Sequence, residues 1–214
     1  MSARERILAR IRERQGKRDA ATPEEFEAVR AHLADHPRNP APRDPWDPPT
    51  RFRERALSLA CTLDEAEKLS DAPQRVAAYL RERGLPLHAV CWRELAGLEW
   101  ALAGIDVEIR PARGSDLVGI TGAYCAISET GTLMTVSGAE TAPSVSLLPE
   151  THIALVRRER IVRSMEDAWA LLRADAKMPR AVNFISGPSR TADIEQTLTL
   201  GAHGPYRVHI VLVP

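Results

Sequence analysis

Two short polar stretches of the sequence carry residue types that bind or transform small anions. The first, Glu129-Thr130-Gly131-Thr132, interrupts two apolar runs of β-strand character. Small residues continue on both sides of it, and so little side-chain bulk lets a ligand approach the backbone closely. Glu129 is a candidate base, nucleophile or hydrogen-bond acceptor, depending on its burial. The structural alternative is a hairpin turn with Gly131 in the left-handed conformation.

The second stretch, residues 184–205, reads FISGPSRTADIEQTLTLGAHGP. A strand ends at a Gly-Pro turn, after which Ser189 or Thr191 can cap a short helix over 191–200. In α/β sheets, ligands bind at the carboxyl ends of strands, where such junctions lie. Arg190, beside free backbone N–H groups, is suited to receive a carboxylate or phosphate. Acidic residues in the first helical turn favour a purely structural alternative, because they repel an anion and suit a helix N-terminus.

Two of the six histidines are candidate partners for these stretches. His152 begins a predicted strand and would be a plausible partner for Glu129 if the fold brings them together. His203 stands between two glycines in a predicted turn and is a candidate for the same cleft. A lone histidine is more often hydrogen-bonded in a core than catalytic. No catalytic residue is therefore assigned, and Glu129, His152 and His203 remain candidates. No HxH or HExxH motif occurs, and His32 and His36 are the only pair with HxxxH spacing, so a metal site is not expected.

The composition narrows the class of protein. Lys+Arg and Asp+Glu number 29 each in 214 residues, so no global field draws the chain to nucleic acid or an anionic membrane. Hydrophobic residues make up 44%, enough for a substantial core. No apolar run approaches the ~18 residues that cross a bilayer. The first residues lack the apolar segment and cleavage site of a secretory signal, so a cytoplasmic location is expected.

The three cysteines are not placed to form a disulfide framework or to hold a metal cluster. Cys61, Cys91 and Cys125 are far apart and form no C-x-x-C pair. Their spacing excludes a disulfide framework and an ordinary four-cysteine iron–sulfur or zinc site within the chain. We therefore expect no cofactor and no metal here.

The N-terminal segment predicts a helical arm. Residues 2–15 alternate charges with a narrow apolar stripe, and a Thr-Pro pair then begins a second helix over 23–34. Residues 35–49 carry six prolines in fifteen, which excludes a helix or an inner strand. We expect residues 1–49 to form an arm and an extended strap, with Trp46 as an anchor.

Residues 50–214 are predicted to form one α/β domain. Short apolar strands alternate with helical segments, which is typical of a sheet with helices on both faces. The region 117–137 has no helix between its strands and predicts one antiparallel hairpin. The expected strands cover 87–92, 105–110, 117–121, the two halves of 125–137, 151–158, 181–187 and 206–213, and the expected helices cover 51–60, 64–69, 73–83, 93–103, 164–176 and 191–200.

Three segments, AISETGTLMT, LPETHIALV and FISGPSRTADIEQTLTLGAHGP, resemble the LUD-domain family in order and spacing. Within that family they are similar to the members that act in lactate utilization. The resemblance covers roughly residues 50–214, and the helical arm fits it too. It implies a NagB/RpiA/CoA-transferase-like fold with Rossmann-like layering. It also implies a role in bacterial oxidation of L-lactate to pyruvate, together with partner proteins that carry iron–sulfur clusters.

The resemblance does not supply a catalytic residue. CoA transferases of related fold use a glutamate nucleophile, but Glu129 does not inherit that role from a shared fold. The leading hypothesis is a subunit of a lactate-oxidising system that binds a small carboxylate such as lactate or pyruvate, or supports assembly. The alternative is a free-standing CoA-transferase-like or phosphosugar-type enzyme. A nucleic-acid-binding regulator is disfavoured by the neutral charge.

The sequence also suggests where the ligand lies. Strand ends 127–129 and 185–187 are expected to lie side by side at one edge of the sheet. Arg190 and backbone N–H groups near Thr191 would then bind the carboxylate, with Glu129 and His203 facing them. The predicted ligand-binding residues are Thr130, Gly131, Thr132, Ser189, Arg190 and Thr191.

Overall fold

The computed structural model describes residues 2–16, 21–38, 40, 42, 45–175, 178–191 and 199–214. The chain divides into two compact units, Met1–Arg43 and Asp44–Pro214. In the described part of the chain, no helix combines the length and the apolar character needed to span a membrane.

The first unit contains two helices, α1 (Ala3–Gln15) and α2 (Pro23–Asp35), as the sequence predicts. Both begin with a capping box. Ser2 and Glu5 exchange side-chain-to-backbone hydrogen bonds at α1, and Thr22 and Glu25 do the same at α2. Neither helix buries a residue.

The second unit is built on a six-stranded sheet in which every pairing is parallel. The strand order is β1-β12-β7-β4-β2-β3. Buried β-branched and aliphatic residues fill its inner strands, as expected for a sheet covered on both faces. The strands are β1 (Thr62–Glu65), β2 (His88–Cys91), β3 (Asp106–Glu108), β4 (Val118–Gly122), β7 (Thr151–Arg157) and β12 (Arg207–Val213).

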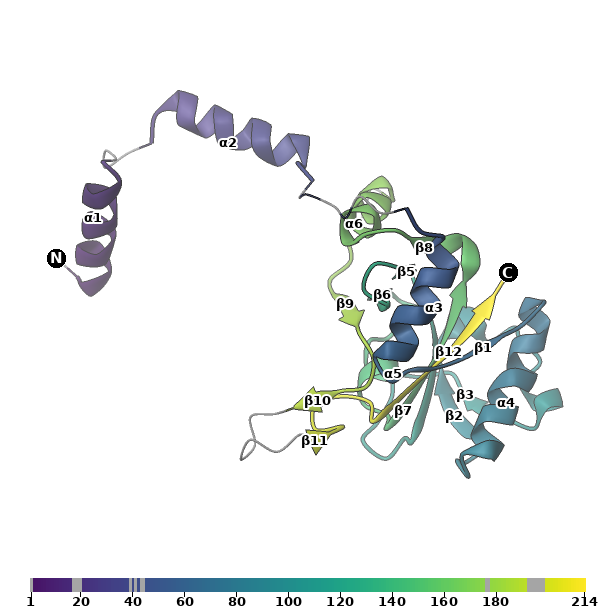
Figure 1. The fold of residues 1–214 in the computed structure, drawn as a ribbon. Helices are drawn as coiled ribbons and strands as arrows, with labels where there is room; N and C mark the ends of the chain where they lie inside the picture. Colours follow the sequence, from purple (N-terminus) through teal and green to yellow (C-terminus); the bar gives the residue numbers. More distant parts are fainter. Residues whose placement is uncertain are drawn as a thin grey trace. The chain divides into compact units, whose positions relative to one another are not determined.

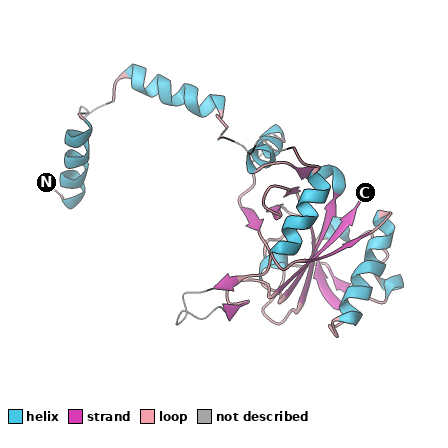
Figure 2. Ribbon diagram, viewed as in Figure 1, coloured by secondary structure: helices cyan, strands magenta, loops and turns pink. Residues whose placement is uncertain are grey.

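Helices cover both faces of this sheet, which confirms the predicted α/β class (Figures 1 and 2). Helix α4 (Ala72–Glu82) packs on one face through Val76, Ala77 and Leu80. Helix α3 (Pro48–Ser58) packs on the other through Phe52 and Ala56. Asp47 caps α3, and its side chain accepts a hydrogen bond from the Thr50 N–H.

A second, four-stranded sheet lies on the α3 face, with the order β8-β5-β6-β9. Strands β5 and β6 form the predicted antiparallel hairpin. Helix α6 (Met165–Ala174) covers the outer face of this sheet through Ala168 and Leu172. The strands are β5 (Cys125–Ile127), β6 (Thr132–Val136), β8 (Ile161–Val162) and β9 (Val182–Ile185), and the short helix α5 (Ser144–Leu147) follows β6.

Three predicted helices are wrong. Residues 64–69 were expected to be helical, but β1 pairs with β12 and its Glu65 is held by ion pairs with Arg53 and Arg158. Tertiary pairing thus overrides the helix propensity of a segment rich in Ala, Glu and Lys.

The expected helix over 93–103 is replaced by two 3-10 turns, Arg93–Leu95 and Ala101–Ala103. Gly97 weakens a helix here. Burial of Trp100 also determines the path, because its indole N–H donates to the carbonyl of Leu95 at 2.9 Å.

The expected helix over 191–200 is wrong at both ends, where β10 (Arg190–Thr191) and β11 (Thr199–Leu200) pair antiparallel. Its middle, residues 192–198, lies outside the described residues, as does the predicted first turn with Asp193 and Glu195.

Candidate functional site

The topology of the central sheet identifies the edge at which a ligand would bind. From β2 the chain passes outward to β3, whereas β4, β7 and β12 follow in order on the other side of β2. Open parallel sheets bind ligands beyond the carboxyl ends of the strands at such a switch point. A cavity of about 340 Å³ lies there. This volume falls at the small end of the range of ligand sites, roughly 300–1,000 Å³.

The cavity, called here the carboxyl-edge pocket, is lined by residues that follow the ends of the parallel strands. Trp92 and Glu94 follow β2, and Gly122 ends β4. Arg157 ends β7, and Arg160 lies three residues further on. The remaining lining residues are Leu69, Leu95, Gly97, Leu98, Ala123, Tyr124, Val136, Thr141, Leu155 and Val213.

The carboxyl group of Glu94 lies against Gly122. A Cβ atom on Gly122 would stand only 2.2 Å from Glu94 Oε1, so the missing side chain makes the space for this carboxyl. Glu94 is exposed as a residue, and it lines the pocket. Burial raises the pKa of Glu94, Arg157 partly offsets this, and Glu140 adds to it.

Two guanidinium groups supply the positive charge of the pocket. Arg157 makes a long ion pair with Glu159, 3.7 Å, and its side chain remains 59% exposed. Arg160 lies 5.0 Å from the ring centroid of Tyr124, a cation–π contact. Tyr124 is fixed in turn, because its hydroxyl donates to Asp175 at 2.6 Å. Burial and the Asp175 carboxylate raise the pKa of Tyr124 to about 12, so the phenol stays protonated.

This arrangement can hold a small acid and exchange a proton with it. A guanidinium binds a carboxylate through two parallel hydrogen bonds. A carboxyl with a raised pKa is suited to general acid–base work near neutral pH. Arg157, Arg160 and Glu94 bring both functions into one cavity.

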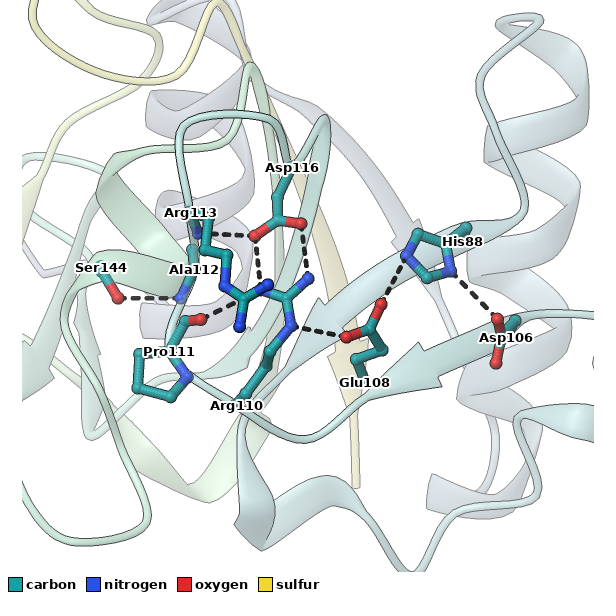
Figure 3. Close-up of polar contacts among 9 residues, drawn as sticks. All are labelled: His88, Asp106, Glu108, Arg110, Pro111, Ala112, Arg113, Asp116 and Ser144. Carbon is teal, nitrogen blue, oxygen red and sulfur yellow. Dashed lines mark hydrogen bonds and ion pairs between the residues drawn. The ribbon is translucent and has the colours of Figure 1, made fainter.

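A second polar cluster lies at the edge strand β3, and its groups satisfy one another (Figure 3). Arg110 forms two hydrogen bonds with Asp116, at 2.7 and 2.8 Å, and one with Glu108 at 2.6 Å. His88 lies between Glu108 and Asp106, 3.1 Å from each. Hydrogen bonds from Arg110 lower the pKa of Asp116 to about 2. We interpret the cluster as a clasp that fixes the loop between β3 and β4.

The Glu129–Thr132 stretch forms the β5–β6 turn and packs on α3. Gly131 has φ +72°, and a Cβ atom there would lie 2.7 Å from the Ala56 nitrogen. The carbonyl of Glu129 accepts a hydrogen bond from Arg55 Nε at 3.2 Å. The threonine hydroxyls form a chain from Thr130 through Thr132 to Ser186, at 2.7 and 2.8 Å.

The structure therefore brings this turn beside the end of β9, as the sequence suggests, although β6 separates β5 from β9. Trp46 is the expected anchor, since its indole N–H donates to Ser128 Oγ at 3.0 Å. The ligand-binding role of the turn stays a prediction.

The Ser189–Arg190 stretch lies beside the amino ends of the central strands rather than at the carboxyl-edge pocket. Ser189 N–H donates to the carbonyl of Pro205, two residues before β12 begins. Arg190 Nη2 donates to the carbonyl of Leu59, just before β1. His203 is exposed in the turn before β12. The side chain of Thr191 is outside the described part of the chain.

His152 is fully buried in β7 and bonds to Thr121 rather than to Glu129. Its Nε2 lies 2.8 Å from Thr121 Oγ1. Burial lowers the pKa of His152 to about 4. Burial and nearby Arg83 lower the pKa of His209, which stacks on Tyr79, to about 4 as well. Both rings are neutral in the folded protein near neutral pH.

We expect these histidines to make the protein sensitive to mild acid. Between pH ~6.5 and ~4 the unfolded chain binds a proton at His152 that the folded chain does not. The free energy of unfolding should therefore fall as the pH is lowered through this window, by about 1.4 kcal/mol per pH unit for each such histidine. Urea unfolding from pH 7 to pH 4.5 measures the slope.

His152→Gln can keep a hydrogen bond to Thr121 but cannot titrate, so its slope should be shallower. His209→Gln is the second variant if the first fails to fold. Equal slopes in wild type and variants would contradict the assignment.

Glu94, Arg157 and Arg160 are not among the residues predicted from the sequence, because they belong to no unusual motif. A simple signal could have found them. Glu94 lies two residues after the predicted strand 87–92, Arg157 lies at the end of the predicted strand 151–158, and Arg160 lies three residues beyond Arg157. Applying the carboxyl-end rule to every predicted strand would have grouped LHAVCW with Glu94 and THIALV with Arg157.

Comparison with known proteins agrees with the family that the sequence resembles. The LUD domain family matches residues 80–213. Lactate utilization protein C 1 of Bacillus mycoides (strain KBAB4) is 38% identical over 118 residues, 53% of this chain and 50% of that protein. Lactate utilization protein C of Bacillus subtilis (strain 168) is 37% identical over 119 residues, 54% of this chain and 49% of that protein.

The fold also has a solved counterpart. The crystal structure of a DUF162 family protein from Deinococcus radiodurans superposes with a TM-score of 0.60 at 23% identity, over 79% of this chain and all of that one. This likeness supports the fold alone. The chain spans about half the length of the curated relatives it matches.

Proposed function

The chain belongs to the LUD-domain family, and from this premise we propose that it serves in lactate utilization and binds a small carboxylate in the carboxyl-edge pocket. The names of the relatives supply the metabolic role. The pocket supplies the chemistry. The observation that carries the proposal is that Arg157, Arg160 and Glu94 line one small cavity at the switch point of the sheet.

Each group has a separate task in this proposal. One guanidinium binds the carboxylate of lactate or pyruvate through paired hydrogen bonds. Glu94, with its raised pKa, faces the neighbouring hydroxyl or carbonyl oxygen and takes or returns its proton. Trp92 and Leu155 form apolar walls against which the methyl group packs.

Oxidation of lactate to pyruvate releases two electrons and two protons, one from the hydroxyl, which Glu94 takes, and one from the carbon that bears it, which passes to water. We propose that iron–sulfur partner proteins accept the two electrons. The cysteines of this chain are poorly suited to hold a cluster. All three are buried, and burial raises the pKa of Cys61 and Cys125 to about 11 and of Cys91 to about 12. Thiolates are the ligands of such clusters, and these thiols are held protonated.

The isolated chain is therefore expected to contain no iron–sulfur cluster and to hide its thiols. A thiol reagent should label none of the three cysteines in the native protein and all three after denaturation. Stoichiometric iron and sulfide in a chain purified anaerobically without partners would overturn this expectation.

The proposed function is tested by binding and by reconstitution. Calorimetric titration of the purified chain should detect binding of L-lactate or pyruvate. Competition by an excess of inorganic phosphate in the same titration tests the phosphosugar alternative. Lactate-dependent reduction of an acceptor should require both this chain and the iron–sulfur partners. Turnover of acyl-CoA by the chain alone would instead support the free-standing transferase.

A further inference from the structure

The two helices of the arm carry apolar side chains that nothing in the described part of their unit covers. On α2, Phe26, Val29 and Leu33 follow the i, i+3, i+7 spacing of a single stripe and are 57–63% exposed. On α1, Ile7 and Ile11 lie one turn apart and are 60% and 46% exposed. Helices of 13 residues are marginal in water, so these well-capped helices need a packing partner to be stable.

The two helices have opposite charge. Helix α1 holds five arginines and two glutamates, a net charge of +3. Helix α2 holds four acidic residues and one arginine, a net charge of −3. The apolar stripe of α1 is therefore flanked by mainly basic residues, and the apolar stripe of α2 by mainly acidic residues.

We propose that two copies of this chain associate through their arms, the α1 stripe of each packing against the α2 stripe of the other. A two-fold axis makes such a surface self-complementary, because each copy offers both the basic and the acidic helix. Four helices enclose a core on all sides, whereas two helices with narrow stripes leave theirs open to water. The association needs no contribution from the carboxyl-edge pocket and stands apart from the proposed function.

Sedimentation equilibrium of the full-length protein at micromolar concentration tests this proposal. The natural sequence should have twice the chain mass of 23.6 kDa. The double variant Val29→Asp/Leu33→Asp should have the mass of one chain, because buried carboxylates oppose the packing. Leu102→Asp is the matched control, since Leu102 is 77% exposed on the other unit, and it should remain dimeric.

The dependence of the dimer on ionic strength provides a second test. Raising the ionic strength should weaken the dimer, because the contacts between α1 and α2 are screened. A monomeric natural protein would overturn the proposal and indicate that α1 pairs with α2 of its own chain. A dimer that persists in the double variant would overturn it too, because the contact would then lie outside the arm.

Discussion

Replacing Arg157 by alanine is expected to weaken binding of L-lactate roughly 10- to 100-fold, because a hydrogen bond to a charged group contributes about 1.5–3 kcal/mol. The melting temperature should hardly change, since the side chain is 59% exposed and its ion pair with Glu159 is long. Calorimetric titration gives the affinity, and thermal unfolding followed by circular dichroism gives the stability.

Arg190→Ala is the matched control, and it also distinguishes the carboxyl-edge pocket from the other location proposed for the ligand. Arg190 is the residue to which the sequence assigned the ligand, on the expectation that it lies at the carboxyl ends of the strands; it is exposed and lies beside the amino ends of the central strands. The carboxyl-edge proposal expects its removal to leave affinity nearly unchanged. A loss of affinity in Arg190→Ala with none in Arg157→Ala would move the site to the other end of the sheet.

Gly119→Ala is expected to destabilise the domain by about 3 kcal/mol or more, the upper end of the usual cost of overpacking. Gly119 lies inside β4, and an added Cβ would stand 2.0 Å from the carbonyl oxygen of Val145 and 2.9 Å from Pro149 Cγ. The oxygen belongs to the backbone of α5, so the whole segment must move. For a domain of this size the melting temperature should fall by roughly 6–12 °C.

Gly122→Ala is the control for this prediction. Its added Cβ would meet the tip of the Glu94 side chain, which can swing away at small cost. We expect little change in melting temperature but a displaced carboxyl, and hence altered pH dependence of lactate binding. If Gly122→Ala destabilises as much as Gly119→Ala, the close approach of α5 to β4 is not the cause.

The elements with strong apolar patterns could be predicted from the sequence, because burial of those residues determines their structure. This holds for β4, β7 and β12, for the β5–β6 hairpin and for helix α6. Helices α1 and α2 bury no residue and were predictable from their capping residues instead. Prediction failed where a distant partner decides. The sequence of the β1 segment favours a helix, but its pairing with β12 makes it a strand. Around Trp100, burial of the indole and its hydrogen bond to Leu95 favour turns over a helix.

The site was harder to predict for the same reason. Glu94 and Arg157 are 63 residues apart in the sequence, and only the order of the strands brings them to one cavity. The motif-rich stretches around Glu129 and Arg190 are easier to notice, yet the contacts described for them are structural. The Glu129 carbonyl accepts from the Arg55 side chain, and the Arg190 guanidinium donates to the Leu59 carbonyl.

The position of β12 in the sheet also determines when the domain can fold. Strand β12 pairs with β7 on one side and with β1 on the other, so residues 62–65 find their partners only in residues 209–212. During synthesis, β1 and β7 must each wait with an open edge until the last strand leaves the ribosome. Pairings across such long sequence separations form slowly, and open edges in the interval invite aggregation. The domain is therefore expected to complete its sheet in one late step, and to depend on chaperones more than its modest size suggests.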